Sequence, residues 1–221
     1  MFNLIVKDFL VQKKSVLFSF GYCIFVLLFF SHNQALNNSI YIMAAAAVSY
    51  MLLQGAAYAD EKNASAIILN SLPLSRKNLV LAKYLTLVAY LAMGLTFSGI
   101  IGFILPITIN FPVRPITVAD VTVSIISVGI MASIYLPLFF KFGNNIIRLV
   151  NVALFMLTFF VPGIIIAQLK NQPSGFLGQL IDVLRNLPGW LVTLGALTIT
   201  GIVLSVSMAI SLRIYNNKDL C

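Results

Sequence analysis

One run of the chain reads SIYIMAAAAVSYMLLQGAAYA, from Ser39 to Ala59, and carries no charged side chain. It is followed at once by Asp60, Glu61 and Lys62. A helix needs about 20 apolar residues to cross a bilayer core of about 30 Å. The run has that length, so it predicts a membrane-spanning helix that ends at a charged boundary.

Five further uncharged runs of this kind occur along the chain. They are Val16–Ser31, Tyr84–Ile109, Val121–Phe140, Leu149–Leu169 and Gly189–Leu212. Of the 221 residues, 60% are hydrophobic and only 9% are charged, which leaves too few charges to cover a water-exposed surface. We predict an all-α membrane protein, a single domain over residues 1–221 with six transmembrane helices. The run Tyr84–Ile109 contains Pro106, where a long span tilts or breaks.

The basic residues indicate the orientation of the spans. Lys and Arg near span ends are retained on the cytoplasmic side of a membrane. An inside N-terminus puts eleven of the 14 basic residues in inside segments and leaves Arg114, Lys170 and Arg185 outside. We therefore expect both termini in the cytoplasm. Because the basic residues lie beside span ends, the net charge of +8 does not indicate nucleic-acid binding.

Residues 1–14 precede the first span and have a pattern of their own. Their apolar members recur at helical spacing: Phe2, Ile5, Val6, Phe9 and Leu10. Asn3, Lys7, Asp8 and Lys14 point elsewhere. The pattern predicts an interfacial helix, with Lys7, Lys13 and Lys14 near anionic lipid. The alternative is a ragged start to the first span.

The longest inside loop, residues 60–83, has an apolar middle between two charged groups. The middle contains Ala64, Ala66, Ile67, Ile68 and Leu69. Pro73 ends the short helix that this pattern predicts, and Ser75 is suited to cap the helix that enters the next span. A partly apolar helix in a cytoplasmic loop needs a cover. The alternative is a solvated connector resting on the membrane surface.

Outside, residues 170–188 carry an apolar stripe that predicts a second helical element at the membrane surface. Pro162 and Gly163 lie within the preceding run. Two arrangements follow from them: a straight fifth span with a solvated loop, or a span broken at Pro162 whose end forms a helical hairpin with the stripe.

The six runs contain no Asp, Glu, Lys, Arg or His. Ionisable residues inside spans usually mark proton or ion routes, so their absence disfavours a proton-coupled transporter and an intramembrane protease. The chain also lacks a G-x-x-x-x-G-K-[ST] phosphate loop. Cys23 and Cys221 have no metal-ligand spacing. We expect no catalytic residue, no metal site and no cofactor on this chain.

Small residues mark where spans pack closely. Gly94, Gly99 and Gly102 lie in the third run, and Ala44–Ala47 lie in the second. Small side chains let helix backbones approach each other in a membrane. We therefore expect packing, rather than a ligand site, at these positions.

Two segments on either side of the loop middle resemble a known family. They read Tyr58-Ala59-Asp60-Glu61-Lys62-Asn63 and Ser71-Leu72-Pro73-Leu74-Ser75-Arg76-Lys77, leading through Val80 and Ala82 to Lys83-Tyr84. They look like the permease subunits of ABC-2 type transporters, of the small bacterial half-size kind. The layout of the whole chain is similar as well.

The resemblance implies partners and a location. A permease of this family pairs with a second permease copy or a paralogue and with separate nucleotide-binding ATPase subunits, which carry the ATP and Mg. It contacts membrane lipids in the bacterial cytoplasmic membrane. A coupling helix in the first cytoplasmic loop docks on the ATPase. On this chain that role falls on Asn63, Ala64, Ile67, Ile68, Leu69 and Leu72, with Lys141 and Arg148 as a second contact.

The resemblance also implies an ATP-driven exporter whose path lies between facing permeases. On this chain the path would be lined by uncharged groups: Tyr50, Met51, Gln54, Phe155, Thr158 and Phe159. Such a lining suits hydrophobic or amphipathic cargo, and amphipathic or antimicrobial peptides are the first expectation. The alternative is a membrane-anchored accessory or scaffold protein that transports nothing.

Overall fold

The computed structural model describes residues 2–31, 37, 39–63, 75–109, 111, 113–143, 152–153, 156 and 188–217. Its main elements are the helices α1 (Phe2–Val11), α2 (Lys13–Phe30), α4 (Ile40–Lys62), α6 (Arg76–Ile109), α7 (Val118–Phe142) and α10 (Gly189–Asn216). All of these except α1 are long and apolar enough to cross a membrane. The described part of the chain contains no strand, so the all-α prediction is confirmed there.

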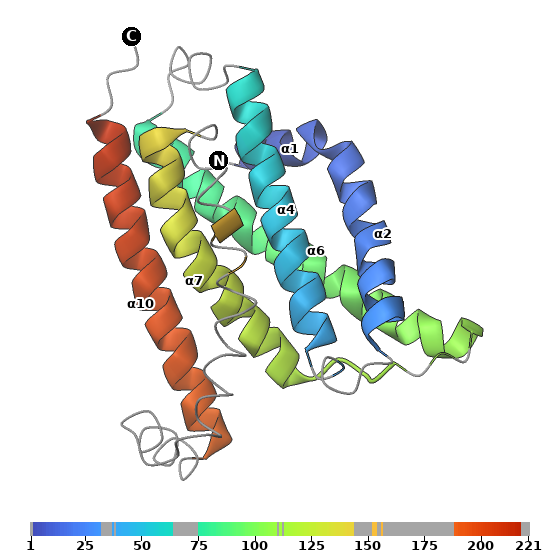
Figure 1. The fold of residues 1–221 in the computed structure, drawn as a ribbon. Coiled ribbons are helices and arrows are strands. Elements are labelled where there is room, and N and C mark those ends of the chain that lie inside the picture. The colour runs from blue at the N-terminus through green and yellow to red at the C-terminus, as the bar shows by residue number, and fades with distance from the viewer. Residues whose placement is uncertain are drawn as a thin grey trace.

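The prediction of six spans is confirmed for five of them. The run Leu149–Leu169 lies almost wholly outside the described residues, and the predicted element at 170–188 lies outside them up to Pro188. Helices α7 and α10 run in the same direction (Figure 1), as the six-span topology requires.

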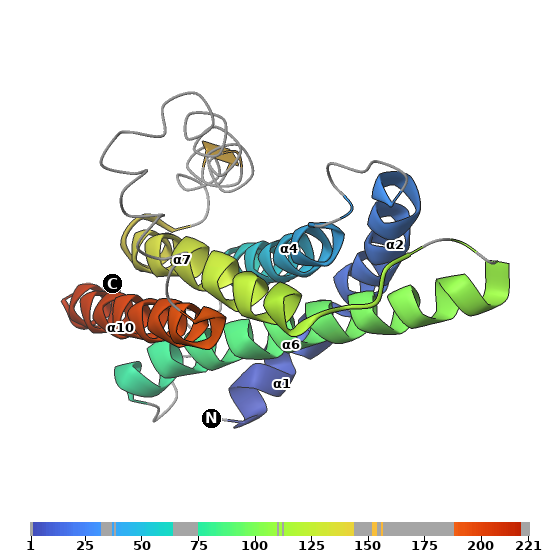
Figure 2. The ribbon, with the colours of Figure 1, turned by 90° about the horizontal axis from the view of Figure 1, so that it is seen from below.

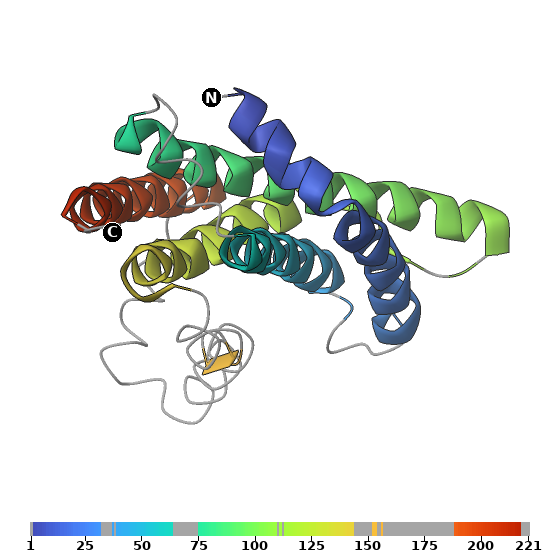
Figure 3. The same cartoon turned by 90° about the horizontal axis from the view of Figure 1, so that it is seen from above.

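The spans form a bundle in which α4 is central. Helix α4 packs against α2, α6 and α7, whereas α10 packs mainly on α7 and less on α6. Helix α6 is tilted and crosses the bundle along its whole width (Figure 2). Seen from the other end, α1 begins on the side of α6 opposite to α4 and α7 and crosses α6 to reach α2 (Figure 3). Pro106 lies inside α6 without ending it, so the long third span tilts rather than breaks.

Two ends of the bundle can be distinguished in Figure 1. The α1 end carries α1 itself, the end of α4, the start of α6 and the ends of α7 and α10. Helix α7 stops there at Gly143, whose φ of 74° is a conformation that favours glycine. The opposite end carries the end of α2 and the starts of α4, α7 and α10.

The helices extend beyond the uncharged runs that predicted them. Helix α2 begins at Lys13, α4 continues to Lys62, and α6 begins at Arg76, just after Ser75. The Ser75 Oγ accepts a hydrogen bond from the Asn78 N–H at 3.4 Å, so the predicted N-cap is confirmed. Charge therefore marks where the apolar surface ends, not where the helix ends.

Small residues bring α4 and α6 together. Of the three glycines predicted to allow close packing, two lie where the helices meet. A Cβ on Gly94 would lie 3.0 Å from the Ala45 carbonyl oxygen, and one on Gly102 would collide with the Tyr41 side chain. A Cβ on Gly99 would meet nothing within 4 Å, so this glycine is not a packing residue. The close approach buries the α4 face that faces α6.

Candidate functional site

The chain turns between α1 and α2 at Gln12, which is buried between α1 and α6. Its Nε2 donates to the Tyr90 hydroxyl at 2.7 Å and to the Asp8 carbonyl at 3.3 Å. The ring of Phe9 meets the Tyr90 ring edge-on, with 5.0 Å between centroids. These contacts fix α1 against α6 instead of leaving it as a continuation of α2, so residues 2–11 form a helix of their own, and its place in the membrane interface stays a prediction.

Four charged side chains meet where α1, α4 and α6 come together, and we call Lys7, Asp8, Asp60 and Lys83 the ion cluster. The Lys7 Nζ lies 2.7 Å from Asp60 Oδ1 and 3.4 Å from Asp8 Oδ1. The Lys83 Nζ lies 2.8 Å from Asp8 Oδ2 and also pairs with the other carboxylate oxygen of Asp60. Each ammonium therefore contacts both carboxylates.

The ion cluster is largely shielded from solvent. The side chains of Asp8, Lys83, Asp60 and Lys7 are 5%, 14%, 16% and 30% exposed. Burial alone would lower the pKa of the Lys7 ammonium, but the hydrogen bond to Asp60 and the charges of Asp60 and Asp8 outweigh it and raise the pKa. Because charges of opposite sign balance, the cluster holds three helices together, and removing one member leaves an uncompensated charge.

This arrangement corrects the role predicted for two residues of α1. Lys7 was expected near anionic lipid, but its ammonium is engaged by Asp60. Asp8 was expected off the packing face, but it is buried against Lys83. The amphipathic pattern misplaced them because it treats a charged side chain as solvated, whereas here opposite charges on α4 and α6 compensate it.

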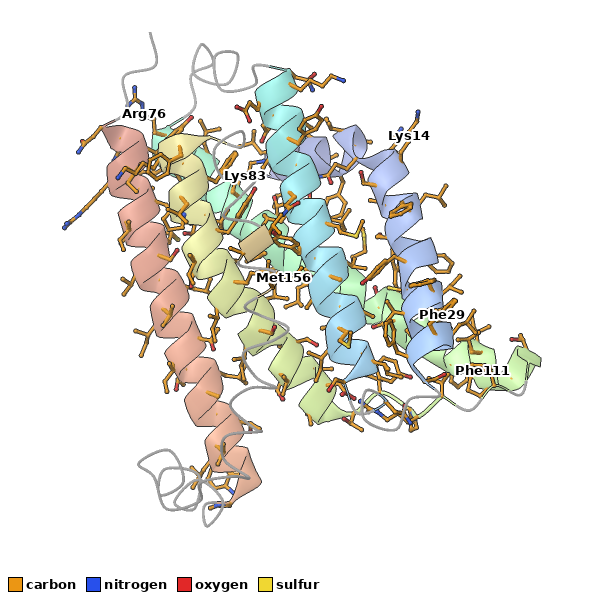
Figure 4. The ribbon with its side chains drawn as sticks, viewed as in Figure 1. Lys14, Phe29, Arg76, Lys83, Phe111 and Met156 are labelled. Atoms are coloured by element: carbon orange, nitrogen blue, oxygen red, sulfur yellow. The ribbon has the colours of Figure 1, made fainter. Side chains whose placement is uncertain are left out.

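The start of α6 is joined to the end of α10 by Arg76. Its Nη1 donates to the Asn216 carbonyl at 2.7 Å and to the Tyr215 carbonyl at 3.3 Å. The last carbonyls of a helix lack helical partners and carry partial negative charge, so a guanidinium stabilises them. Figure 4 shows Arg76 and Lys83 at the same end of the molecule.

Hydroxyl groups continue this connection into the bundle. The Tyr84 hydroxyl is hydrogen-bonded to Ser207 at 2.8 Å and to Ser211 at 3.0 Å, which joins α6 to α10. The Ser207 hydroxyl also donates to the Ser133 carbonyl of α7 at 2.7 Å. A displacement of the α6 start would therefore act directly on α7 and α10.

The opposite end has a different charged group, Arg114 with Asp120, which we call the end clamp. Their two hydrogen bonds, from Nη1 and Nη2 to the two carboxylate oxygens, are both 2.7 Å long. The hydrogen bond to Asp120 raises the pKa of the Arg114 guanidinium. Arg114 also donates from Nε to the Asn37 carbonyl at 2.9 Å, and Asp120 forms a capping box with Thr117.

The sequence profile of the family described as ABC-2 family transporter protein matches residues 3–216, nearly the whole chain. No curated protein and no solved structure gives a significant match.

The chain belongs to the ABC-2 transporter family.

It is therefore a multi-pass membrane protein and a permease component of an ABC transporter, and it is not itself an ATPase. ABC-2 permeases generally partner with a nucleotide-binding ATPase subunit. The resemblance seen in the two segments around residues 58–84 is confirmed at the level of the family.

The structure describes only part of the ATPase-docking set expected for an ABC-2 permease. Asn63 is exposed directly after α4, and its N–H is bonded to the Ala59 and Glu61 carbonyls. Lys141 is exposed in the last turn of α7, with its Nζ 4.9 Å from the centre of the Phe142 ring. The other expected residues lie outside the described residues: Ala64, Ile67, Ile68, Leu69, Leu72 and Arg148.

Of the residues expected to line the transport path of an ABC-2 permease, the structure describes those on α4. Tyr50 is buried, and its ring meets the Tyr135 ring of α7 with 6.5 Å between centroids. Met51 and Gln54 on the same helix are half-buried. Phe155, Thr158 and Phe159 lie outside the described residues, so the path stays a prediction.

The residues that sequence reasoning missed are the members of the ion cluster and the end clamp. A usable signal was present for the ion cluster. Asp60 and Lys83 are the charges nearest to two successive spans on the same side of the membrane, and Asp8 and Lys7 precede another span on that side. Opposite charges at neighbouring span ends are candidates for pairing.

Proposed function

We propose that this ABC-2 permease is energised by a separate ATPase subunit that binds ATP and Mg and docks on the loop between α4 and α6. The α1 end would then face the cytoplasm, with both termini inside a bacterial cytoplasmic membrane, as the distribution of basic residues favours. Movement of the docked subunit enters through this loop and changes how the spans pack.

The observation that carries the proposal is the ion cluster. Asp60 is three residues before the docking segment that begins at Asn63, and Lys83 is about two helical turns after Arg76, where α6 begins. The same cluster holds α1 through Lys7 and Asp8. A displacement of either end of the loop would therefore move α1, α4 and α6 together.

The composition of the loop supports a protein partner. Ile67, Ile68 and Leu69 are large apolar residues in a loop, and each contributes about 1.5–3 kcal/mol when fully buried. A groove on an ATPase subunit would supply that burial. Among the charged residues around them, Glu61, Lys62 and Lys77 are exposed and suited to form a polar rim, while Asp60 and Arg76 are used for contacts within the chain.

The cargo is proposed to be hydrophobic or amphipathic, with amphipathic or antimicrobial peptides as the leading class. A path without charged groups favours such molecules, and the spans described here carry charged residues only near their ends. We propose export between two facing permeases, either two copies of this chain or this chain with a paralogue.

The docking proposal is tested by changing Ile68 and Leu69 to Asp together. An unpaired charge in a dry groove costs several kcal/mol, so we expect ATPase co-purification and nucleotide-driven transport to fall sharply while membrane insertion is retained. The control is Val118→Asp, which puts one carboxylate in place of an apolar side chain that is 81% exposed at the opposite end.

The control should leave ATPase association unchanged. If the double variant still binds the ATPase subunit as wild type does, the loop is not the coupling element. If no ATPase subunit associates with the wild-type chain either, the accessory or scaffold function becomes the better interpretation.

A further inference from the structure

The outward side of α2 carries a groove whose lining contains no residue of the proposed transport path. It is lined by Lys14, Leu17, Phe18, Gly21, Tyr22 and Phe25 and has a volume of about 650 Å³. Its lining residues recur at three- and four-residue spacing, so they lie on one face of the helix. Lys14, Leu17, Phe18 and Phe25 are all exposed on this face.

The floor of the groove is Gly21. A Cβ at this position would meet no heavy atom within 4 Å, so the space above the glycine is unfilled. Phe18, Tyr22 and Phe25 rise around it as large side chains. The result is an apolar depression long enough to follow the helix for about three turns.

Among the described residues that line the depression, one is a cation, Lys14, and it lies at one end. Lys14 lies in the first turn of α2, at the α1 end, and Figure 4 shows its side chain pointing away from the other helices. Lys7 is engaged in the ion cluster, so Lys14 and its neighbour Lys13 are the exposed cations beside the start of the span. Among these lysines, Lys14 alone lines the groove.

We propose that the groove binds one anionic phospholipid, with its headgroup phosphate on Lys14 and an acyl chain lying over Gly21. A phospholipid provides an anion and an apolar chain in one molecule, at the spacing at which the groove offers a cation and an apolar floor. A second copy of the chain fits less well, because its apolar helix face would leave Lys14 without a counter-charge. The site is independent of what the permease transports.

The test counts lipids that stay bound to the full-length protein in native mass spectrometry. Phosphatidylglycerol is compared with phosphatidylcholine of the same acyl chains. We expect phosphatidylglycerol to bind more tightly, and Lys14→Gln to weaken its binding about fivefold, the effect of one lysine near a headgroup. Lys13→Gln is the matched control at the same depth and should change binding less than about twofold.

The floor of the groove is tested separately by Gly21→Leu, which should weaken the binding of both lipids by filling the depression. Gly201→Leu, at an exposed glycine of α10 that also has no neighbour within 4 Å, should leave lipid binding unchanged. Equal effects of Lys13→Gln and Lys14→Gln would mean general attraction to an anionic surface and would overturn the site. A change in oligomeric state with Gly21→Leu, without a change in lipid binding, would assign the groove to a second copy instead.

Discussion

The two ends of the bundle are both held by shielded opposite charges, but at each end these charges connect different parts of the chain. The ion cluster joins α1, α4 and α6, and its partners are up to 75 residues apart in the sequence. The end clamp joins Arg114 to Asp120, which are six residues apart, and Arg114 is linked to the segment before α4 by a hydrogen bond to the Asn37 carbonyl rather than by a second charge. At the α1 end, charge pairs therefore connect three helices directly, whereas at the opposite end the charge pair holds the entry to α7 and a hydrogen bond provides the link to the segment before α4.

This difference predicts that substitutions at the two ends lower the free energy of unfolding by unequal amounts. Asp60→Ala leaves Lys7 and Lys83 facing a single carboxylate, that of Asp8, in a shielded site. We expect the free energy of unfolding to fall by about 3–5 kcal/mol, because a buried ammonium loses its counter-charge. Thermal unfolding in detergent should detect this as a fall in Tm of roughly 10 °C.

The control for Asp60→Ala is Glu61→Ala, which removes the next carboxylate along the helix, one that is exposed. Surface substitutions usually change stability by no more than about 0.5 kcal/mol. Equal destabilisation by the two variants would mean that the ion cluster contributes nothing beyond a surface charge.

A substitution at the opposite end should lower the free energy of unfolding by less. Arg114→Gln leaves Asp120 with the Thr117 N–H and hydroxyl as donors, each at 2.8 Å, so the carboxylate stays partly compensated. We expect a loss of about 1–3 kcal/mol, measured by the same unfolding experiment. The loss of stability in Arg114→Lys should lie between zero and that of Arg114→Gln, because an ammonium keeps the charge without the two parallel hydrogen bonds. A loss as large as that of Asp60→Ala would remove the distinction between the two ends.

The spans could be predicted from sequence because hydropathy and length are local properties. The uncharged run Ser39–Ala59 became α4, and the run Tyr84–Ile109 became the second part of α6. Its Pro106 left two outcomes open, a tilted helix or a broken one, and α6 continues through Pro106 to Ile109. The charged helix ends were missed because a charge ends an apolar run without ending the hydrogen-bonded ladder.

The pairing of charges could not be predicted in the same way. Asp8 and Lys83 meet only because α1 folds back across α6 at Gln12, and no periodicity in residues 1–14 encodes that turn. The same holds for Arg114, which was interpreted as an ordinary outside loop residue. Its contact with the Asn37 carbonyl depends on how the start of α4 approaches the segment before α7.

The central claim is that the ion cluster transmits movement from a docked ATPase subunit to α1, and one measurement tests it directly. The variant Lys7→Gln with Asp8→Asn removes one charge of each sign from α1 and leaves the Asp60–Lys83 pair between α4 and α6, so no unpaired charge remains in the ion cluster. Spin labels at Val11 of α1 and Ile202 of α10, both exposed, report their distance in the membrane-reconstituted complex.

Trapping the nucleotide-bound state of the associated ATPase should shift this distance in the wild-type complex. The shift should persist in the variant Arg114→Gln with Asp120→Asn, which removes the matching pair of charges at the opposite end, and it should be lost in Lys7→Gln with Asp8→Asn. A full shift in the latter variant, with the ATPase subunit still bound, would contradict the claim that the ion cluster carries the movement.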